Sequence, residues 1–174
     1  EMTGFAYGVH ENLIKNGFSV IGLDFLEQRK VAFEAMGGQL AKDFAEIGRA
    51  SDAVFVMVMN GTQAKEIILG ENGLVASMEK GGTILLTATI KPSEAREIGA
   101  AMAGSGIDLI DSPVSGGFPG AQGGSLTLMA AAPADILVKN RRVMEAVSKT
   151  IHHVGSDVGM GQTVKACLQS LIGS

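Results

Sequence analysis

Two continuous apolar runs constrain the fold of this chain more than any other feature. Residues 53–59 are Ala-Val-Phe-Val-Met-Val-Met, and residues 83–86 are Thr-Ile-Leu-Leu. Runs without polar alternation are typical of strands that are buried on both faces, as in parallel sheets. A third run, residues 18–23, follows Asn16-Gly17 and predicts another strand. We therefore expect a sheet that is covered by helices on both sides.

Helical segments alternate with these strands. The sequence predicts helices over residues 8–15, 27–36, 92–102 and 134–146, and Pro92 suits the first turn of the third one. A βαβα order implies right-handed crossovers and a parallel sheet, with ligands at the carboxyl ends of the strands. The predicted fold class is therefore α/β, with a Rossmann-like, doubly wound and mostly parallel sheet.

Composition narrows the classes of protein further. The 174 residues, 46% of them hydrophobic, fit one domain or a domain with an appendage. A net charge of −4 without a basic stripe, and 5% aromatic residues, argue against a nucleic-acid partner, and no apolar run approaches the ~20 residues of a membrane span. The single cysteine, Cys167, excludes an internal disulfide, and we expect it to be buried. A cytoplasmic location follows, or an organellar matrix.

A glycine-rich loop near the end of the chain leads into a helix that carries Lys165. Lys165 and Gln169 stand four residues apart, so an ammonium and an amide point the same way. A neighbouring stripe at helical spacing is expected to be buried, and consists of Val164, Leu168, Leu171 and Ile172. Lys165 is therefore a candidate for chemistry, and the alternative is a solvated lysine at a helix start.

A second motif, Asp111-Ser-Pro-Val-Ser-Gly-Gly117, follows an apolar run. A strand that ends in Ser115, Gly116 and Gly117 exposes backbone N–H groups without side chains that hinder an anion. This segment is a candidate cradle for a carboxylate. The alternative is an ordinary tight turn between two strands.

A candidate nucleotide site lies at the predicted strand ends. Asp24 closes the run 18–23 and falls 20 residues after Gly4, which is close to the spacing at which an acidic residue meets a ribose hydroxyl. A carboxylate there would repel the 2′-phosphate of NADP, so NAD is favoured, although Arg29 is near in sequence. The alternative for Asp24 is a solvated residue that ends a strand.

Together, the motif 111–117, the glycine-rich stretch 120–129 and the distal Gly-x-Gly-x-x-x-Lys resemble the 3-hydroxyacid dehydrogenases, the family of 3-hydroxyisobutyrate and threonate dehydrogenases. The resemblance implies that Lys165 is the catalytic acid/base and that Ser115, Gly116 and Gly117 bind the substrate carboxylate. Gln169, which would orient substrate or lysine, stands where most members carry asparagine, and this favours the threonate branch.

The resemblance also implies cofactor contacts. The dinucleotide would pass over the backbone at Asn60, and Thr89 would reach the nicotinamide. Gly4 would belong to the phosphate-binding loop, and Asp24 would meet the ribose. The implied reaction is reversible, NAD-dependent oxidation of a small 3-hydroxy acid, without a metal. We expect this chain to be weak or inactive as a dehydrogenase on its own. His152 and His153 are adjacent, so in a strand they diverge and make poor metal ligands.

The start of the chain departs from the family pattern. Thr3 stands at the second glycine of the phosphate loop and Ala6 at the third, and no hydrophobic first strand precedes them. We therefore expect a Rossmann-like sheet that lacks its first strand, over residues 1–155. Residues 156–174 would be a glycine-rich loop and the start of an inter-domain helix, without the family's all-helical domain.

Two other functions stay open. One is a degenerate, non-catalytic Rossmann module of a multidomain protein, which Thr3 favours. The other is an NADPH-dependent semialdehyde or glyoxylate reductase, against which Asp24 argues. Expected partners are a small hydroxy acid and either a second copy of the chain or a larger parent polypeptide, without nucleic acid or membrane.

Overall fold

Three parallel strands of four residues form the centre of the sheet. In the computed structural model, which describes residues 3–24 and 27–172, β3 (Ala53–Val56), β4 (Thr83–Leu86) and β5 (Asp108–Asp111) pair in register, so that Val54, Ile84 and Leu109 are level. All four residues of β4 are buried. The prediction of a parallel sheet buried on both faces is confirmed here.

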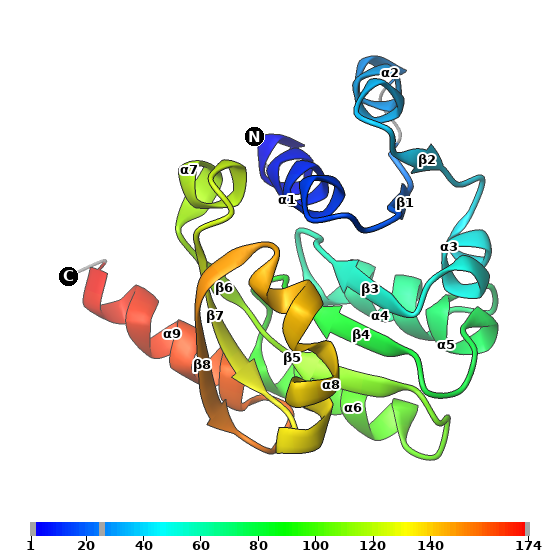
Figure 1. Ribbon diagram of the computed structural model, residues 1–174. Coiled ribbons are helices and arrows are strands. Elements are labelled where there is room, and N and C mark those ends of the chain that lie inside the picture. Colours follow the sequence, from blue (N-terminus) through cyan, green and yellow to red (C-terminus); the bar gives the residue numbers. More distant parts are fainter. Residues whose placement is uncertain (1–2, 25–26, 173–174) are drawn as a thin grey trace.

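The sheet becomes mixed beyond β5. Strand β7 (Leu126–Ala131) runs antiparallel to β5 and to the short β6 (Val114–Ser115), and parallel to β8 (Ser148–Gly155). On the opposite side, β1 (Ile21–Gly22) and β2 (Gln39–Leu40) form a separate parallel pair. Figure 1 places this pair, with the adjoining helix α2 (Glu27–Ala35), away from the main sheet.

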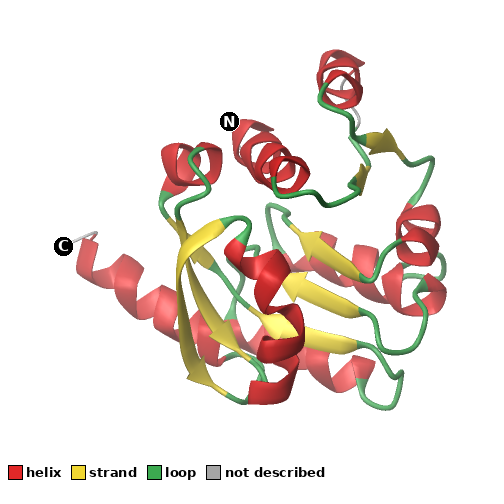
Figure 2. Cartoon of the chain, in the orientation of Figure 1, coloured by secondary structure: helices red, strands yellow, loops and turns green. Residues whose placement is uncertain are grey.

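Helices cover both faces of the sheet, as Figures 1 and 2 show. One face carries α4 (Gly61–Leu69), α5 (Leu74–Ser77) and α6 (Pro92–Met102), and the other carries α1 (Thr3–Lys15) and α8 (Ala134–Glu145). Successive residues of β4 alternate between the two cores: Ile84 and Leu86 belong to the first, and Leu85 to the second. The remaining helices are α3 (Phe44–Ala50), α7 (Gly117–Gln122) and α9 (Met160–Ile172).

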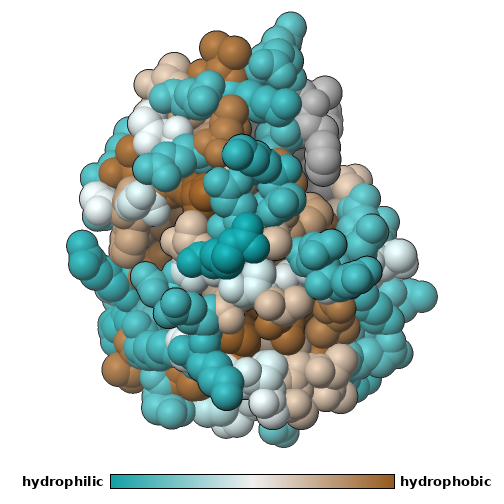
Figure 3. Space-filling model, turned by 90° about the vertical axis from the view of Figure 1, so that its right-hand side faces the viewer, coloured by the Kyte–Doolittle hydropathy of each residue, from teal (hydrophilic) through white to brown (hydrophobic). Residues whose placement is uncertain are grey.

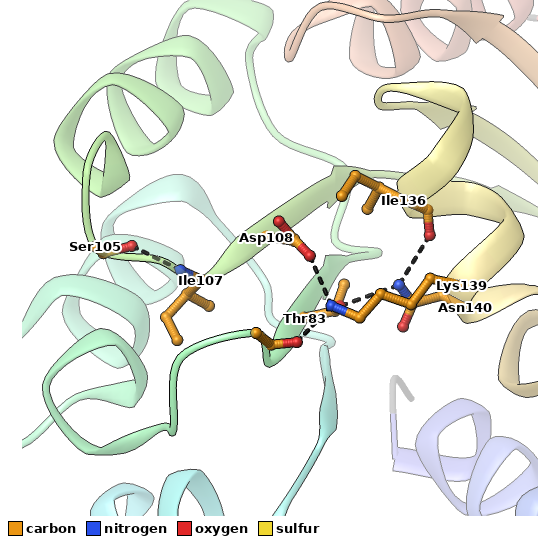
Figure 4. A network of polar contacts seen from close by, with 8 residues as sticks. Thr83, Ser105, Ile107, Asp108, Ile136, Lys139 and Asn140 are labelled. Atoms are coloured by element: carbon orange, nitrogen blue, oxygen red, sulfur yellow. Dashed lines mark hydrogen bonds and ion pairs between the residues drawn. The ribbon is translucent and has the colours of Figure 1, made fainter.

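Helix α8 is attached to the amino ends of β4 and β5 by polar contacts (Figure 4). The buried Asn140 donates to the hydroxyl of Thr83 at 3.0 Å, and Lys139 makes an ion pair with Asp108 at 2.8 Å. Lys139 also donates to the carbonyl of Gly81. These contacts lie at the edge opposite the carboxyl ends of the strands, so they fix the helix without occupying the predicted ligand edge.

A buried carboxylate attaches α9 to the sheet. Asp111, the last residue of β5, is fully buried, and its Oδ2 accepts hydrogen bonds from the backbone N–H groups of Gly159 at 2.8 Å and Gln162 at 3.2 Å. Its Oδ1 accepts from the side chain of Gln162 at 2.9 Å. Gln162 also bridges to the backbone of Ile90 and Ala88. The start of α9 is therefore held at the carboxyl ends of β4 and β5.

Several boundaries differ from the sequence predictions. Helix α1 begins at Thr3, five residues before the predicted start, because the glycine-rich segment continues the helix. The strand predicted over 18–23 is reduced to the two residues of β1, which pair only with the equally short β2. Helix α7 lies within residues 111–129, where the sequence predicted only strands and turns.

His10 on α1 gives the fold a pH dependence. The side chain of His10 is half-buried, and its ring lies 4.9 Å from that of Phe33. Burial lowers the pKa of His10 below its ordinary value of 6.5, and Asp24 partly offsets this. The unfolded chain therefore binds this proton more readily than the folded chain does. The contribution of neutral His10 to the stability of the fold is present above pH 6.5 and is lost as the pH falls through the lowered pKa of His10.

We predict that His10→Gln reduces the loss of thermal stability between pH 7.5 and pH 5. Melting temperatures of both chains across this range are the measurement. The matched control is His152→Gln, in an exposed position on β8. In this variant the melting temperature should change with pH as it does in the unsubstituted chain. An unchanged slope in His10→Gln would contradict the assignment.

We also predict that Asp111→Asn destabilises the chain by about 1–3 kcal/mol, because an amide offers one acceptor oxygen to three donors and leaves buried groups unsatisfied. Chemical denaturation measures this free energy of unfolding. Asp157→Asn is the control, since Asp157 is exposed in the same loop. Equal losses in the two variants would show that the buried contacts are not what holds α9.

Candidate functional site

The predicted ligand edge brings together residues that follow three neighbouring strands. Asn60 follows β3, Thr89 follows β4, and Asp111 ends β5, and the parallel register puts all three at the carboxyl edge. The hydroxyl of Thr87 is buried and donates to the carbonyl of Val56 at 3.1 Å, whereas Thr89 is exposed. Of the two threonines, Thr89 is therefore the one available to a ligand.

Asn60 has a structural task at this edge. Its side-chain oxygen accepts the backbone N–H of Gln63 at 2.9 Å, which caps the first turn of α4. The side-chain oxygen is therefore occupied, and a ligand would meet the backbone of Asn60 or the remaining amide N–H groups.

The segment predicted as a carboxylate cradle joins β6 to α7. Ser115 is half-buried and pairs with Thr127 of β7, and the next two residues, Gly116 and Gly117, are exposed. Their φ angles are +123° and +57°, values that residues with a side chain rarely adopt, so both positions need glycine. The turn therefore exposes two successive residues that carry no side chain of their own.

Next to it, Ser112 carries a buried hydroxyl for which the described residues provide no hydrogen-bond partner. Such a group is commonly satisfied by water or a ligand atom. Its neighbour Asp111 is buried as well, and desolvation raises the pKa of that carboxyl, against the hydrogen bonds from Gln162 and Gly159.

The glycines before Lys165 have separate functions. Gly159 has φ +98° and donates its N–H to Asp111. A Cβ on Gly161 would stand 2.6 Å from the carbonyl oxygens of Asp111 and Met129, so only glycine allows α9 to pack this closely on the sheet. Lys165, four residues after Gly161, lies on the same side of the helix, one turn beyond this contact.

Lys165 is half-buried, and desolvation by burial lowers the pKa of its ammonium below the ordinary value of 10.5. Within the part of the chain that the structure describes, it has no hydrogen-bond or ion-pair partner. An amine that is partly desolvated and not neutralised by a carboxylate gives up its proton more readily than a solvated lysine does. This favours a chemical role over that of a lysine in a surface ion pair.

The rest of α9 is more open than predicted. Gln169 and Cys167 are exposed, so the expectation that Cys167 is buried is wrong. The stripe expected to be buried is exposed too: Val164 is 38% exposed and Leu171 is 77% exposed, while Leu168 is intermediate. The side chain of Ile172 lies outside the described residues. The apolar residues recur at helical spacing, but Val164 and Leu171 are not buried by the described residues.

The other cofactor candidates lie near β1 and α1. Asp24 is half-buried just after β1 and forms an ion pair with Arg29 at 3.7 Å. Gly4 lies in the first turn of α1, not in a loop before it, and side chains of this helix are described from Ala6 onward. A Cβ on Gly8 would stand 2.6 Å from the backbone N of Gln122, so Gly8 serves close packing of α1 on α7.

The predicted residues thus form two groups. Ser115 ends β6, Gly116 and Gly117 follow it, and Lys165 lies on α9. The start of α9 approaches the segment before β6, because the Cδ of Pro113 is 2.9 Å from the position of a Cβ on Gly161. Asp24, Asn60 and Thr89 follow β1, β3 and β4. Sequence reasoning did not assign Asp111 and Gln162, although an acidic residue that closes an apolar run was a signal for the first.

The described residues contain no group of three or more His, Cys, Asp and Glu side chains placed to hold a metal ion. No helix among them has the length and apolarity required to cross a bilayer.

Comparison with known proteins supports a nucleotide-binding fold. Residues 7–155 match the family of the NAD binding domain of 6-phosphogluconate dehydrogenase. The chain is 32% identical to the L-threonate dehydrogenase of Cupriavidus necator over 167 residues, which cover 96% of this chain and 56% of that protein. It is 34% identical to the NAD-dependent L-serine dehydrogenase of Pseudomonas aeruginosa over 161 residues, covering 92% and 54%.

A solved structure agrees. The 3-hydroxyisobutyrate dehydrogenase of Salmonella typhimurium superposes with a TM-score of 0.92 at 27% identity, over 99% of this chain and 60% of that one. The chain therefore spans little more than half the length of these relatives. It belongs to the family of the NAD binding domain of 6-phosphogluconate dehydrogenase, and it is similar to proteins named L-threonate dehydrogenase and 3-hydroxyisobutyrate dehydrogenase.

Proposed function

We propose that this chain is the cofactor-binding part of an NAD-dependent dehydrogenase that oxidises a small 3-hydroxy acid. The observation that carries the proposal is Lys165, a half-buried amine without a carboxylate partner among the described residues, on a helix that Asp111 fixes to the ligand edge of the sheet. A base for a hydroxyl proton requires this combination of position and lowered pKa.

The chemistry assigned to each residue follows from its surroundings. In the oxidation direction, the neutral amine of Lys165 takes the proton of the substrate hydroxyl. Bound NAD supplies the hydride acceptor. The bare backbone of Ser115, Gly116 and Gly117 holds the substrate carboxylate by N–H donation. Gln169, four residues after Lys165 on the same side of α9, orients the substrate or the lysine.

The residues at the carboxyl edge fit a dinucleotide. The half-exposed carboxylate of Asp24 can accept hydrogen bonds from a ribose diol, and the exposed hydroxyl of Thr89 is available to the nicotinamide end. The backbone at Asn60 lies along the same edge. Gly4 would serve the pyrophosphate from the first turn of α1, where helix N–H groups favour an anion.

The substrate class is a further proposal. Gln169 in place of asparagine, and the similarity to an L-threonate dehydrogenase, support a polyhydroxy acid such as threonate over 3-hydroxyisobutyrate. We assign residues 1–155 to the dinucleotide-binding domain. Residues 156–174 would be the loop and helix that lead to the rest of a larger, cytoplasmic or matrix protein, with a homo-oligomer as its expected state.

Arg29 supports a second candidate. Its guanidinium lies 3.7 Å from Asp24, so it stands where it could bind the 2′-phosphate of NADP. A reductase of semialdehydes or glyoxylate that uses NADPH would exploit this arginine. The two candidates differ in whether the carboxylate or the guanidinium determines the choice of cofactor.

We predict that NAD binds at least about tenfold more tightly than NADP, because Asp24 repels a 2′-phosphate. Calorimetric titration of each dinucleotide into the chain measures this. In Asp24→Ser the preference should shift toward NADP, and in Arg29→Gln it should not. Tighter binding of NADP would favour the reductase, and binding of neither would favour a degenerate, non-catalytic module.

We predict that, in the larger protein proposed above, Lys165→Met lowers kcat/KM for a 3-hydroxy acid by about 10²–10⁴-fold while the Kd of NAD changes little. The rate without this substitution should rise with pH as Lys165 loses its proton, with an inflection below 10.5 because its pKa is lowered. Steady-state rates from pH 6 to pH 10 measure both. Lys149→Met, in an exposed position on β8, is the control and should keep the original profile.

A further inference from the structure

Helix α7, which directly follows the candidate carboxylate turn, depends on its neighbours for its order. It has six residues, and glycine or proline occupies three of them, Gly117, Pro119 and Gly120. A helix this short, built from poor helix formers, is not stable by itself. Gly116 is its N-cap and Gly117 its first residue. The contacts that hold α7 therefore also hold the two glycines of the turn.

The hydrogen bonds of α7 reach into the turn. The N–H of Gly120 donates to the carbonyl of Gly116 at 3.0 Å. A helix rises about 1.5 Å per residue, so the last carbonyls of α7 lie only about 9 Å from the turn along the axis. A displacement at the end of α7 would therefore move the residues that we assign to the substrate carboxylate.

Asn12 of α1 holds the end of α7. Its side-chain amide donates to the carbonyl of Ala121 at 2.8 Å and to that of Gln122 at 3.1 Å. It also donates to the carbonyl of Gly8, one turn earlier on its own helix, at 2.8 Å. The amide carries two N–H groups for these three carbonyls, so one N–H is shared. Because the last carbonyls of a helix lack partners within it, Asn12 supplies donors that α7 does not contain.

Close packing supports the same contact. A Cβ on Gly124, just after α7, would stand 2.7 Å from the side-chain oxygen of Asn12. Val9 and Leu13 of α1 are buried in the same core as Ala121 of α7. Figure 1 shows α7 next to α1, whereas α2 and α3 lie on the other side of the molecule, which Figure 3 shows with hydrophobic residues among hydrophilic ones. Helix α1 is therefore a fixed support for α7.

The same helix is assigned to the cofactor at its other end. Gly4, which we assign to the pyrophosphate, lies in the first turn of α1, eight residues before Asn12. Eight residues of helix span about 12 Å, so Asn12 is not itself in contact with a pyrophosphate at that turn. Helix α1 would thus support the cofactor at one end and, through Asn12, the substrate turn at the other.

We propose that Asn12 is a positioning residue: through α7 it sets the place of the turn 115–117, and so the affinity for the substrate carboxylate, without touching substrate or cofactor. The inference rests on the proposed function, because it takes the turn to be the carboxylate site. The hydrogen bonds from Asn12 to α7 are its structural basis.

The first test is amide hydrogen exchange of the 174-residue chain, measured by NMR without any ligand. In Asn12→Ala the amide of Gly120 should exchange about tenfold faster, because its bond to Gly116 opens more often when α7 loses its support. The amide of Thr83 in β4, which donates to Asp52 at 2.9 Å, should keep its rate. Equal acceleration of both amides would indicate general destabilisation and would overturn the proposal.

Two further variants sharpen this test. Asn12→Asp keeps the shape of the side chain but replaces its donors with acceptors, so it should accelerate exchange at Gly120 at least as much as Asn12→Ala does. Asn16→Ala is the matched control. Among the described residues, the side chain of Asn16 donates to the carbonyls of Asn12, at 2.8 Å, and Ala146, at 3.5 Å. Its removal should leave exchange at Gly120 unchanged.

The second test measures steady-state kinetics of the larger protein proposed above, with threonate as the substrate. Asn12→Ala should raise KM for threonate about tenfold and change kcat and the Kd of NAD less than about threefold, while Asn16→Ala should change none of them. An unchanged KM in Asn12→Ala would overturn the proposal. If the protein oxidises no 3-hydroxy acid, the proposed function fails, and exchange at Gly120 still decides whether Asn12 positions the turn.

Discussion

The carboxylate of Asp111 is the interaction on which the candidate site depends. It is buried at the end of β5, and it is surrounded by three donors from the loop and first turn of α9. Removal of a carboxylate from water is unfavourable, and the raised pKa of Asp111 reflects that cost. The hydrogen bonds offset it only while Gly159 and Gln162 keep their places. The position of Lys165 relative to the strand ends is therefore coupled to the integrity of this buried cluster.

The same edge combines two kinds of residue that are easily confused. Asn60 and Thr87 are polar residues at strand ends, yet the first caps α4 and the second is buried against Val56. Thr89 and Lys165, by contrast, have no partner among the described residues that would explain their polarity. The distinction between the two kinds depends on hydrogen bonds, which the sequence does not contain. Because Thr89 and Lys165 have no such hydrogen bonds, they are the better candidates for contact with ligands.

The sequence predicted the elements whose signal is local. The apolar run 83–86 and the helix 92–102, which begins with proline, have the predicted bounds. A strand that is buried on both faces is continuously apolar, and proline favours the first turn of a helix. Helix α7 was missed, since six residues with three glycine or proline positions resemble a turn. The stripe on α9 was predicted to be buried and is exposed, because periodicity shows that a face is apolar but not what covers it. Asp111 was quoted in a motif, but its partners lie about fifty positions away in the chain, at Gly159 and Gln162.

The exposed stripe also bears on the chemistry of Lys165. Lys165 itself is half-buried, so its ammonium is desolvated only in part, and the neighbouring Val164 and Leu171 are exposed on the same helix. Desolvation disfavours the charged form of an amine, and its effect grows with the depth of burial. An apolar surface that covered Lys165 as well as the stripe would remove more water from its ammonium and lower its pKa further. The fold described here thus places the base, and the extent to which its pKa is lowered depends on what lies against α9.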